Sequence, residues 1–315
     1  MRKIVSILCL FVVVLTGCGG GGTSGSEYVP PKTERLVRFG DPFIMLFENT
    51  YYAYGTNAEN GIEVYTSEDL KVWERVAALA LNKSNTTEDR WFWAPEVYFV
   101  NGKFYMYYSA NEHMFVATSD SPLGPFKQVG NKPMLDGEKA IDNSLFIDDD
   151  GKPYLFFCRF NDGNTIWVAE LEDDLTTMKK ETMHPCMHVS QDWEKVWPRV
   201  NEAAFVVKRD GLYYMTYSGN SYESQFYGVG CATATDIMGE WTKYDNNPLL
   251  QKPGKLVGVG HSASFYDKEG NYRIVFHAHN NTSNIHPRAM YISTITFDDA
   301  GKMLISPDYI TPVMK

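Results

Sequence analysis

The chain has 315 residues and a formal net charge of −10, and aromatic residues make up 14% of it. Nucleic-acid phosphates require clusters of Lys and Arg, so an acidic chain of this kind is not expected to bind nucleic acid. Neutral ligands suit an acidic, aromatic-rich surface better.

The N-terminus predicts an exported protein with a lipid anchor. Met1, Arg2 and Lys3 precede an apolar run over residues 4–15, which is typical of a signal peptide and too short to span a bilayer as a mature helix. The following LTGC resembles the bacterial lipoprotein box, which implies cleavage after residue 17 and a lipid on Cys18. We therefore expect a lipoprotein of a bacterial cell envelope, on its periplasmic side or outer surface, that contacts the membrane only through this lipid.

Residues 18–34 are rich in Gly and Ser and then Pro, and they predict a flexible tether ahead of a folded domain over residues 35–315. Cleavage would remove the charges of Arg2 and Lys3, which changes the net charge from −10 to −12. The remaining cysteines, Cys158, Cys186 and Cys231, are odd in number and widely spaced. They indicate neither a disulfide framework nor a zinc site, and we expect them to be small core residues.

Five segments of the domain share one pattern, in which a turn precedes a run of aromatic and β-branched residues. They are NTYYAYGT (49–56), NGKFYMYYSA (101–110), DGKPYLFFCR (150–159), DGLYYMTYSGN (210–220) and EGNYRIVFHAH (269–279). Such a run is typical of the second strand of a β-hairpin, and a further strand follows each one. Five repeats of four short strands predict an all-β fold, a five-bladed β-propeller. A two-sheet sandwich would not explain a repeat of this length.

Polar residues recur at one place in the repeat. Asp41 lies eight residues before the turn residue Asn49, and Trp93, Asp142, Glu202 and His261 each lie nine residues before a turn glycine. These positions fall on the first strand of each blade, which lines the central channel of a propeller.

Three carboxylates are therefore predicted to meet on the axis. A single acid there would be explained by a wet channel, but three repel one another and raise the pKa of at least one. Two carboxyl groups across an acetal can hydrolyse it, because one protonates the leaving oxygen while the other activates a water molecule.

Several stretches of residues 35–315 resemble glycoside hydrolase family 43, whose members are five-bladed propellers that cut arabinose- and xylose-containing plant glycans with inversion. GDPFIMLFENTYYAYGT is similar to the segment of the general base, which implies that role for Asp41. AIDNSLFIDDDGKPYLFF is similar to the segment whose Asp tunes the acid, here Asp142, and VNEAAFVVKRDGLYYMTYSGN to the segment of the general acid, here Glu202. FWAPEVYFVNGKFYMYYSA and GVGHSASF match two further signatures of the family.

The chain departs from the family pattern beside two of these acids. Asn143 follows Asp142 where the family usually has Pro, and Ala203-Ala204 follow Glu202 where it usually has Gly-Pro. These changes bear on local geometry and on the subfamily, and all three carboxylates are present.

Three more residues, Trp93, His261 and Arg288, are predicted to contact the sugar. Trp93 is expected as an apolar platform for a sugar face, with either Trp91 or Trp93 in the core. Arg288 resembles the family's arginine that contacts the terminal sugar, and a salt bridge to an acid is the alternative.

His261 resembles the family's central histidine, which in some members helps to hold a hydrated calcium ion. One histidine cannot bind calcium alone, since the ion takes six to eight oxygen ligands, so any structural Ca²⁺ would be bound largely by water. The alternative is that His261 is a hydrogen-bonded residue of the channel. No cofactor is expected to be required, and His277 and His279 are expected to be structural.

The expected function is that of an inverting exo-glycosidase that removes a terminal sugar, α-L-arabinofuranose in the first place, from an oligo- or polysaccharide. A β-xylosidase or β-galactofuranosidase of the same family is the alternative. A non-catalytic glycan-binding lipoprotein would be expected to have lost a carboxylate. A phosphorolytic enzyme would need a cationic pocket, and the sequence offers only Arg288 and Arg199 there.

Overall fold

The computed structural model describes residues 35–196 and 198–315, so the predicted signal peptide, Cys18 and tether lie outside the described residues. Within these two ranges the chain forms β-strands and short 3₁₀ turns and no α-helix. No described segment therefore has the length and hydropathy of a membrane-spanning helix. The 3₁₀ turns are η1 (Lys83–Asn85), η2 (Lys180–Thr182) and η3 (Asp192–Glu194).

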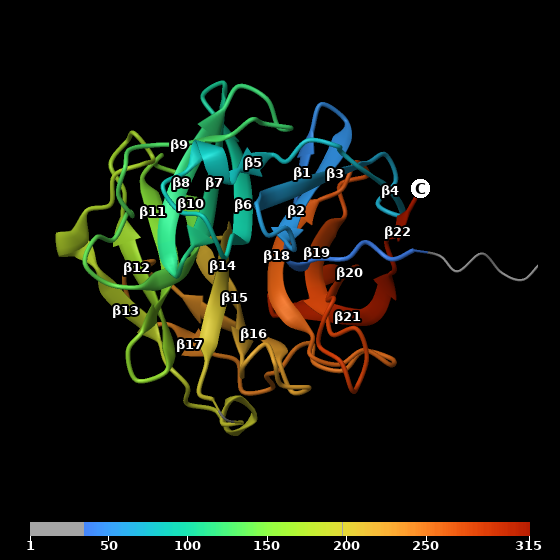
Figure 1. The fold of residues 1–315 in the computed structure, drawn as a ribbon. Coiled ribbons are helices and arrows are strands. Elements are labelled where there is room, and N and C mark those ends of the chain that lie inside the picture. The colour runs from blue at the N-terminus through green and yellow to red at the C-terminus, as the bar shows by residue number, and fades with distance from the viewer. Residues whose placement is uncertain (1–34, 197) are drawn as a thin grey trace, which may run out of the picture. The chain divides into compact units, whose positions relative to one another are not determined.

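The strands form five sheets in chain order, and the first four strands of each pair in antiparallel fashion, which confirms the predicted five-bladed propeller (Figure 1). The first blade contains β1 (Gly40–Phe47), β2 (Thr50–Thr56), β3 (Gly61–Ser67) and β4 (Val72–Arg75), joined by β5 (Leu81–Asn82) and β22 (Val313–Met314). The second contains β6 (Trp93–Val100), β7 (Lys103–Ala110), β8 (His113–Ser119) and β9 (Lys127–Gln128). The third contains β10 (Ala140–Ile147), β11 (Pro153–Phe160), β12 (Asn164–Glu170) and β13 (His184–Met187).

The fourth blade contains β14 (Asn201–Arg209), β15 (Leu212–Gly219), β16 (Gly228–Ala234) and β17 (Thr242–Lys243). The fifth contains β18 (Gly260–Tyr266), β19 (Tyr272–Ala278), β20 (Ala289–Phe297) and β21 (Met303–Ile310). The first strands of successive blades, β1, β6, β10, β14 and β18, pack against one another in a closed ring. This ring surrounds the propeller axis and positions the site.

The turns between the first two strands have the residues that the repeat indicated. Asn101 (φ 50°) and Gly102 (φ 81°) form one two-residue turn, and Asp210 (φ 50°) and Gly211 (φ 80°) form another. Both central residues of such a turn need positive φ, which Asn, Asp and Gly tolerate best. A Cβ atom on Gly102 would meet nothing within 4 Å, so conformation, not space, requires glycine there.

Buried tyrosines tie the blades together. Each of the five blade interfaces is crossed by a hydrogen bond of a tyrosine hydroxyl, and the five tyrosines are Tyr51, Tyr54, Tyr107, Tyr213 and Tyr214. Tyr54, for example, donates to the Pro122 carbonyl of the second blade at 2.6 Å, and Tyr107 to the Leu175 carbonyl of the third at 2.6 Å. Tyrosine suits these positions because its ring packs in the apolar core while its hydroxyl hydrogen-bonds the neighbouring blade.

Every first strand contains a bulge of two residues, and the first bulge residue has a left-handed backbone. These residues are Asp41 (φ 51°), Ala94 (φ 46°), Asp142 (φ 58°), Ala203 (φ 54°) and His261 (φ 50°). A bulge re-aims the side chains next to it, and positive φ is uncommon outside glycine.

The bulges correct the predicted register. Trp93 and Glu202 lie one residue before the bulge, so they are not equivalent to Asp41, Asp142 and His261. The distance from bulge to turn residue is eight where the turn has two residues and nine where it is longer, as between β10 and β11. A count at constant spacing could not detect this difference.

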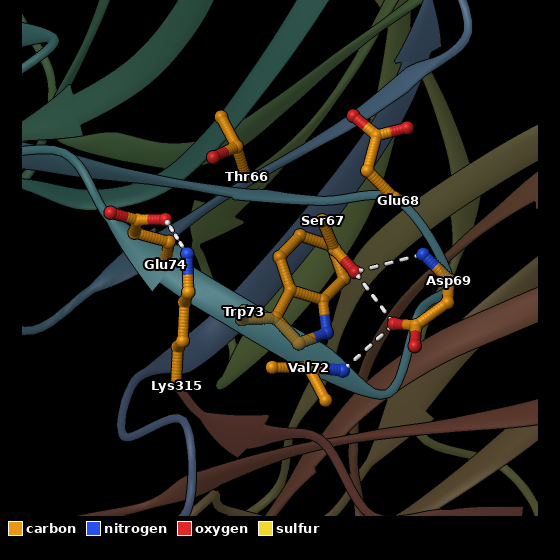
Figure 2. Close-up of a pocket in the computed structure, with 8 residues that line it drawn as sticks. All are labelled: Thr66, Ser67, Glu68, Asp69, Val72, Trp73, Glu74 and Lys315. Carbon is orange, nitrogen blue, oxygen red and sulfur yellow. Dashed lines mark hydrogen bonds and ion pairs between the residues drawn. The ribbon is translucent and has the colours of Figure 1, made fainter.

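The ring closes between the fifth blade and the first. Strand β22 pairs in parallel with β4, where the Val313 N–H donates to the Lys71 carbonyl at 2.8 Å, and Leu36 forms a bridge with Val313. Figure 2 shows the hollow beside this closure, about 300 Å³ in volume, in which Lys315 contacts Glu74. It contains none of the predicted site residues.

Candidate active site

A second cavity, of about 480 Å³, is lined by all six predicted site residues: Asp41, Trp93, Asp142, Glu202, His261 and Arg288. Asp41, Asp142 and His261 belong to the bulge positions of their blades. Trp93 and Glu202 belong to the positions just before the bulge, together with Ile141. The first strands therefore contribute to the site from two successive positions, the bulge residue and the residue before it, and not from one equivalent position.

The bulges are held from the neighbouring blades. Four bulge N–H groups donate to a side chain on the second strand of the preceding blade: Asp41 to His277 Nδ1 (3.1 Å), Ala94 to Thr56 Oγ1 (2.9 Å), Asp142 to Ser109 Oγ (3.0 Å) and His261 to Ser218 Oγ (2.7 Å). These acceptors and Cys158 each pair with the residue before a bulge, and we call the five of them latch residues. Where the latch residue is Cys158, the Ala203 N–H hydrogen-bonds the Asp142 carboxylate.

Asp41 is buried and surrounded by cationic or neutral donors. Arg288 forms a two-pronged salt bridge with it, with Nη1 2.6 Å from Oδ1 and Nη2 3.0 Å from Oδ2. His261 Nδ1 lies 3.2 Å from Oδ1. Burial alone would raise the pKa of Asp41, but Arg288 and then His261 outweigh it and hold the pKa well below its ordinary value. Asp41 is therefore ionised at neutral pH.

Glu202 has the opposite environment. Burial raises its pKa to about 7, and the charge of Asp41 acts in the same direction. Tyr227 and Asn164 partly offset this rise through hydrogen bonds that favour the ionised form. At neutral pH a large share of Glu202 is therefore protonated and able to give a proton to a leaving group.

Asp142 has the same kind of environment as Glu202 and not that of Asp41. Burial, and then the charges of Glu202 and Asp41, hold its pKa well above the ordinary value, and the Ala203 N–H offsets this only in part. Like charges at close quarters cannot all ionise. Asp142 and Glu202 therefore retain a proton that Asp41 does not.

The aromatic residues at the pocket differ from the prediction that one of Trp91 and Trp93 would be core. Trp91 is 46% exposed, and Trp93 is half-buried in the pocket wall, while Phe92 between them is the core residue. The two indoles stack on each other at 5.8 Å, and the Arg90 guanidinium covers the Trp91 ring at 4.4 Å.

The residues around His261 do not by themselves form a calcium site. Its Nδ1 faces Asp41, which leaves one ring nitrogen for an ion that takes six to eight oxygen ligands. Within residues 35–196 and 198–315, no group of three or more His, Cys, Asp or Glu side chains is arranged around a metal position. A calcium ion at His261 would therefore depend on water for most of its ligands.

Several residues of the site were not found from the sequence. Tyr227, Asn164 and Ser109 contact the acids from three different blades, and His277, expected to be structural, holds the Asp41 backbone. The repeat contained a signal for the latch residues, since Thr56, Ser109, Cys158, Ser218 and His277 occupy one place in it. His279 has its expected structural contact, with Nε2 2.6 Å from the Tyr222 carbonyl oxygen.

The departures beside the acids have local explanations. The Asn143 amide donates to the Phe115 carbonyl of the second blade at 2.9 Å, which ties this bulge to its neighbour. Ala203 has φ 54°, a conformation in which the family's usual glycine is unstrained and alanine costs about 1 kcal/mol. Neither change removes a carboxylate from the pocket.

The pocket thus combines one carboxylate held ionised with one held protonated, in a five-bladed propeller. A pair of carboxyl groups in opposite protonation states is typical of enzymes that cleave glycosidic bonds.

Comparison with known proteins agrees. The chain belongs to glycosyl hydrolases family 43, whose family model matches residues 37–303, and it is a glycoside hydrolase.

Two solved structures are similar to the whole propeller. One is described as an endo-1,4-β-xylanase from Bacteroides thetaiotaomicron VPI-5482; it is 45% identical, covers 90% of this chain and 99% of its own, and has a TM-score of 0.86. The other is a thermostable family-43 glycoside hydrolase, 36% identical over 87% of this chain and 94% of its own, with a TM-score of 0.80. A β-D-galactofuranosidase of Aspergillus niger is 26% identical over 84% of this chain and 82% of its own. The names of the Bacteroides and Aspergillus relatives give different sugars, xylose in a xylan and galactofuranose.

Proposed function

We propose that the chain is an inverting exo-glycosidase that releases a terminal α-L-arabinofuranose. In this proposal Asp41 is the general base, Glu202 the general acid, and Asp142 the residue that tunes and orients the acid. The observation that supports it is the opposite protonation of Asp41 and Glu202 in one cavity. Family membership and the resemblance of the three segments support the same roles.

The proposed reaction has one step. The ionised Asp41 accepts a proton from a water molecule as that water attacks the anomeric carbon, and Glu202 gives its proton to the leaving oxygen. The bond to the leaving sugar breaks on the face opposite the water, so the configuration inverts. Asp142 tunes and orients Glu202: the two buried carboxyl groups cannot both ionise, so the pair keeps a proton that Glu202 can give to the leaving oxygen.

The cavity volume suits one terminal sugar, because small-ligand pockets span about 300 to 1,000 Å³. We assign Trp93 to a sugar face, and Arg288 and His261 to hydroxyl groups of that sugar. The terminal sugar remains α-L-arabinofuranose in our proposal. β-D-Galactofuranose is the second candidate because the Aspergillus niger relative that carries that name matches most of both chains. β-Xylose is the third.

We also propose that Cys18 carries a lipid and keeps the enzyme at a bacterial cell envelope. The charged start, the apolar run and the LTGC stretch support this proposal. Labelling of the full chain with a radioactive fatty acid in a bacterial host should mark the parent and not Cys18→Ser. Equal labelling of both would refute it.

The function is tested with residues 35–315 and a panel of substrates. The panel contains nitrophenyl α-L-arabinofuranoside, β-D-galactofuranoside and β-D-xyloside, together with arabinan, arabinoxylan and xylan. The first product's anomer is followed by NMR. We expect one inverted monosaccharide from the arabinose substrates, whereas xylo-oligosaccharides from xylan would contradict the exo-acting assignment.

The acid is tested with Glu202→Gln on two substrates of the same sugar. Activity on a natural linkage should fall by at least about a hundredfold, because general acid catalysis contributes about 10² to 10⁴. Activity on a nitrophenyl glycoside should fall much less, since nitrophenolate leaves without a proton. Equal losses on both substrates would show that Glu202 is not the acid.

A further inference from the structure

Both oxygens of Glu202 are clamped by neutral donors. Tyr227 donates its hydroxyl to Oε1 at 2.9 Å, and Asn164 donates its amide to Oε2 at 2.9 Å. The two donors come from different blades, since Asn164 opens β12 and Tyr227 immediately precedes β16. The carboxyl group is thus fixed in its rotation as well as its position.

Each donor is itself held in place. The Asn164 N–H donates to the Arg199 carbonyl at 3.1 Å, and Asn164 forms a bridge with Val200, two residues before Glu202. Tyr227 is fully buried, and its ring lies over Gly260, where a Cβ atom would be 2.2 Å from ring carbon Cε1. Glycine at this position of the fifth blade therefore makes room for the tyrosine.

The Tyr227 ring also connects the acid to the base. It stacks on the His277 imidazole with ring centres 5.6 Å apart and planes at 18°. His277 in turn accepts the Asp41 N–H at 3.1 Å. A single packed series of groups therefore runs from Glu202 through Tyr227 and His277 to Asp41.

We propose that Tyr227 and Asn164 are positioning residues for the acid: their two hydrogen bonds orient Glu202 toward the leaving oxygen, and the stack of Tyr227 on His277 fixes the acid relative to Asp41. This inference rests on the proposed role of Glu202. Tyr227 is not among the residues that line the cavity, and Asn164 lines it with its amide bound to Glu202 Oε2, so we assign both to act through the carboxyl group that they hold.

The pH dependence of such a device depends on every group that faces Glu202. The titratable and charged groups are Asp41, Asp142, Cys158, Tyr222, Tyr227 and Arg288. Of these, Tyr227 alone hydrogen-bonds the Glu202 carboxylate within the described residues. This bond favours the ionised form, so its loss should raise the pKa of Glu202.

The test is the pH profile of kcat/KM for Tyr227→Phe on a natural-linkage disaccharide. This variant keeps the ring and its stack and removes only the hydroxyl. The basic limb, which reports the protonated acid, should move up by about one pH unit. At the optimum kcat should fall about tenfold or more with little change in KM, while a nitrophenyl glycoside of the same sugar should be affected far less.

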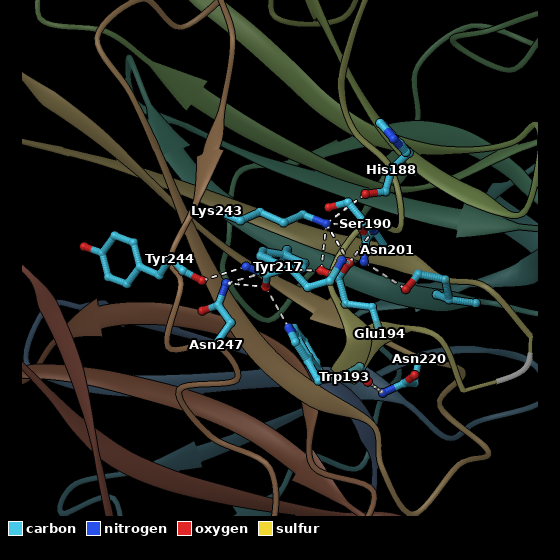
Figure 3. A network of polar contacts seen from close by, with 12 residues as sticks. His188, Ser190, Trp193, Glu194, Asn201, Tyr217, Asn220, Lys243, Tyr244 and Asn247 are labelled. Carbon is cyan, nitrogen blue, oxygen red and sulfur yellow. Dashed lines mark hydrogen bonds and ion pairs between the residues drawn. The ribbon is translucent and has the colours of Figure 1, made fainter.

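The matched control is Tyr217→Phe in the same blade. Tyr217 donates to Glu194 at 2.6 Å in the polar network around Lys243 (Figure 3), and that network does not contact the Glu202 carboxylate. Its loss should lower the unfolding midpoint and leave the basic limb in place. An equal shift in both variants, or no shift in Tyr227→Phe, would overturn the proposal.

Two further variants separate the possible failures. If Tyr227→Phe does not fold, Asn164→Leu removes the other donor and should move the basic limb in the same direction; an unmoved limb would again overturn the proposal. Glu202→Gln distinguishes this inference from the function itself. If Glu202→Gln abolishes natural-linkage activity while the limb stays fixed in the donor variants, the acid is correct and the positioning role is wrong.

Discussion

The Asp41 carboxylate is buried and nevertheless ionised, and Arg288 provides most of the compensation. Two charge-assisted hydrogen bonds of 2.6 and 3.0 Å join the two groups. A Cβ atom on Gly40 would lie 2.0 Å from Arg288 Cζ, so glycine before the first bulge leaves the space that the guanidinium occupies. Asp41 and Arg288 thus form one unit, although 247 residues separate them in the chain.

Replacement of Arg288 by Met should therefore destabilise the fold. Breaking a buried pair leaves an uncompensated charge, and we expect the free energy of unfolding at pH 7 to fall by about 3 to 5 kcal/mol. The native pKa of Asp41 lies below its unfolded value, so the pair contributes stability above pH ~3.9 and loses it as the pH falls through the native pKa. Urea unfolding at pH 7 and at pH 2 should show the larger difference at pH 7.

The control for this prediction is the double variant Asp41→Asn with Arg288→Met. Removal of both charges should recover part of the lost stability, because no buried carboxylate is left unpaired. A double variant less stable than Arg288→Met alone would show that the salt bridge is not what stabilises this region.

The sequence could predict the site residues that recur in the repeat, and it could not predict those that lie outside it. Asp41, Asp142 and Glu202 belong to the repeat and to family-like segments, so the sequence indicated them and the structure brings them together. Tyr227 and Asn164 lie outside the repeated hairpins, and nothing local marks their contacts with Glu202. His277 is neutral and belongs to the repeat, but it accepts the Asp41 N–H only because the fifth blade packs against the first.

At the scale of elements, the bulge is the device that forms the site. It turns one residue of each first strand into a left-handed conformation, and in four of the five blades it binds the N–H of that residue to the preceding blade through a latch residue. The sequence predicted the hairpins correctly, because turn residues and aromatic runs mark them. It did not predict the bulges, because the number of residues from the bulge to the turn residue is eight or nine, depending on the length of the turn. Counting nine residues in every blade therefore placed Trp93 and Glu202 at the bulge, whereas they lie one residue before it.

The latch residues give a prediction at this scale. Ser109→Ala leaves the buried Asp142 N–H without its acceptor, which should lower the free energy of unfolding by about 1 to 3 kcal/mol. The bulge also carries Asp142, so kcat on a natural linkage should fall by about ten- to a hundredfold through misplacement of that carboxyl group. Urea unfolding and steady-state kinetics would measure the two effects.

Thr56→Val is the matched variant, because it removes the same kind of acceptor from the Ala94 N–H, where the bulge carries no carboxylate. Its stability loss should be similar and its loss of kcat clearly smaller. If both variants lose kcat to the same extent, the latch on Asp142 has no special role in the chemistry.

At the scale of the whole molecule, the ring must close before the site exists. Asp41 lies on the first strand of the first blade, and its partners His261, His277 and Arg288 belong to the fifth. The sequence predicted five blades but not how the last one joins the first. Strand β22 has two residues, and its pairing with β4 is parallel, so it lacks the hairpin signal that marks the other strands.

Val313→Pro tests this closure. Proline removes the N–H that donates to the Lys71 carbonyl at 2.8 Å, and it interrupts the pairing of β22 with β4. We expect the free energy of unfolding to fall by about 1 to 3 kcal/mol, measured by urea denaturation. Activity per folded molecule should persist at low temperature, because Val313 is remote from the cavity that contains the carboxylates.

The control is Lys315→Ala, which removes an ion pair with Glu74 between two exposed side chains. Such pairs contribute at most about 1 kcal/mol, so this variant should remain close to the parent. If Val313→Pro is as stable as Lys315→Ala, the closing strand does not hold the ring. The contacts between β1 and β18 would then suffice to bring the first and fifth blades together around Asp41.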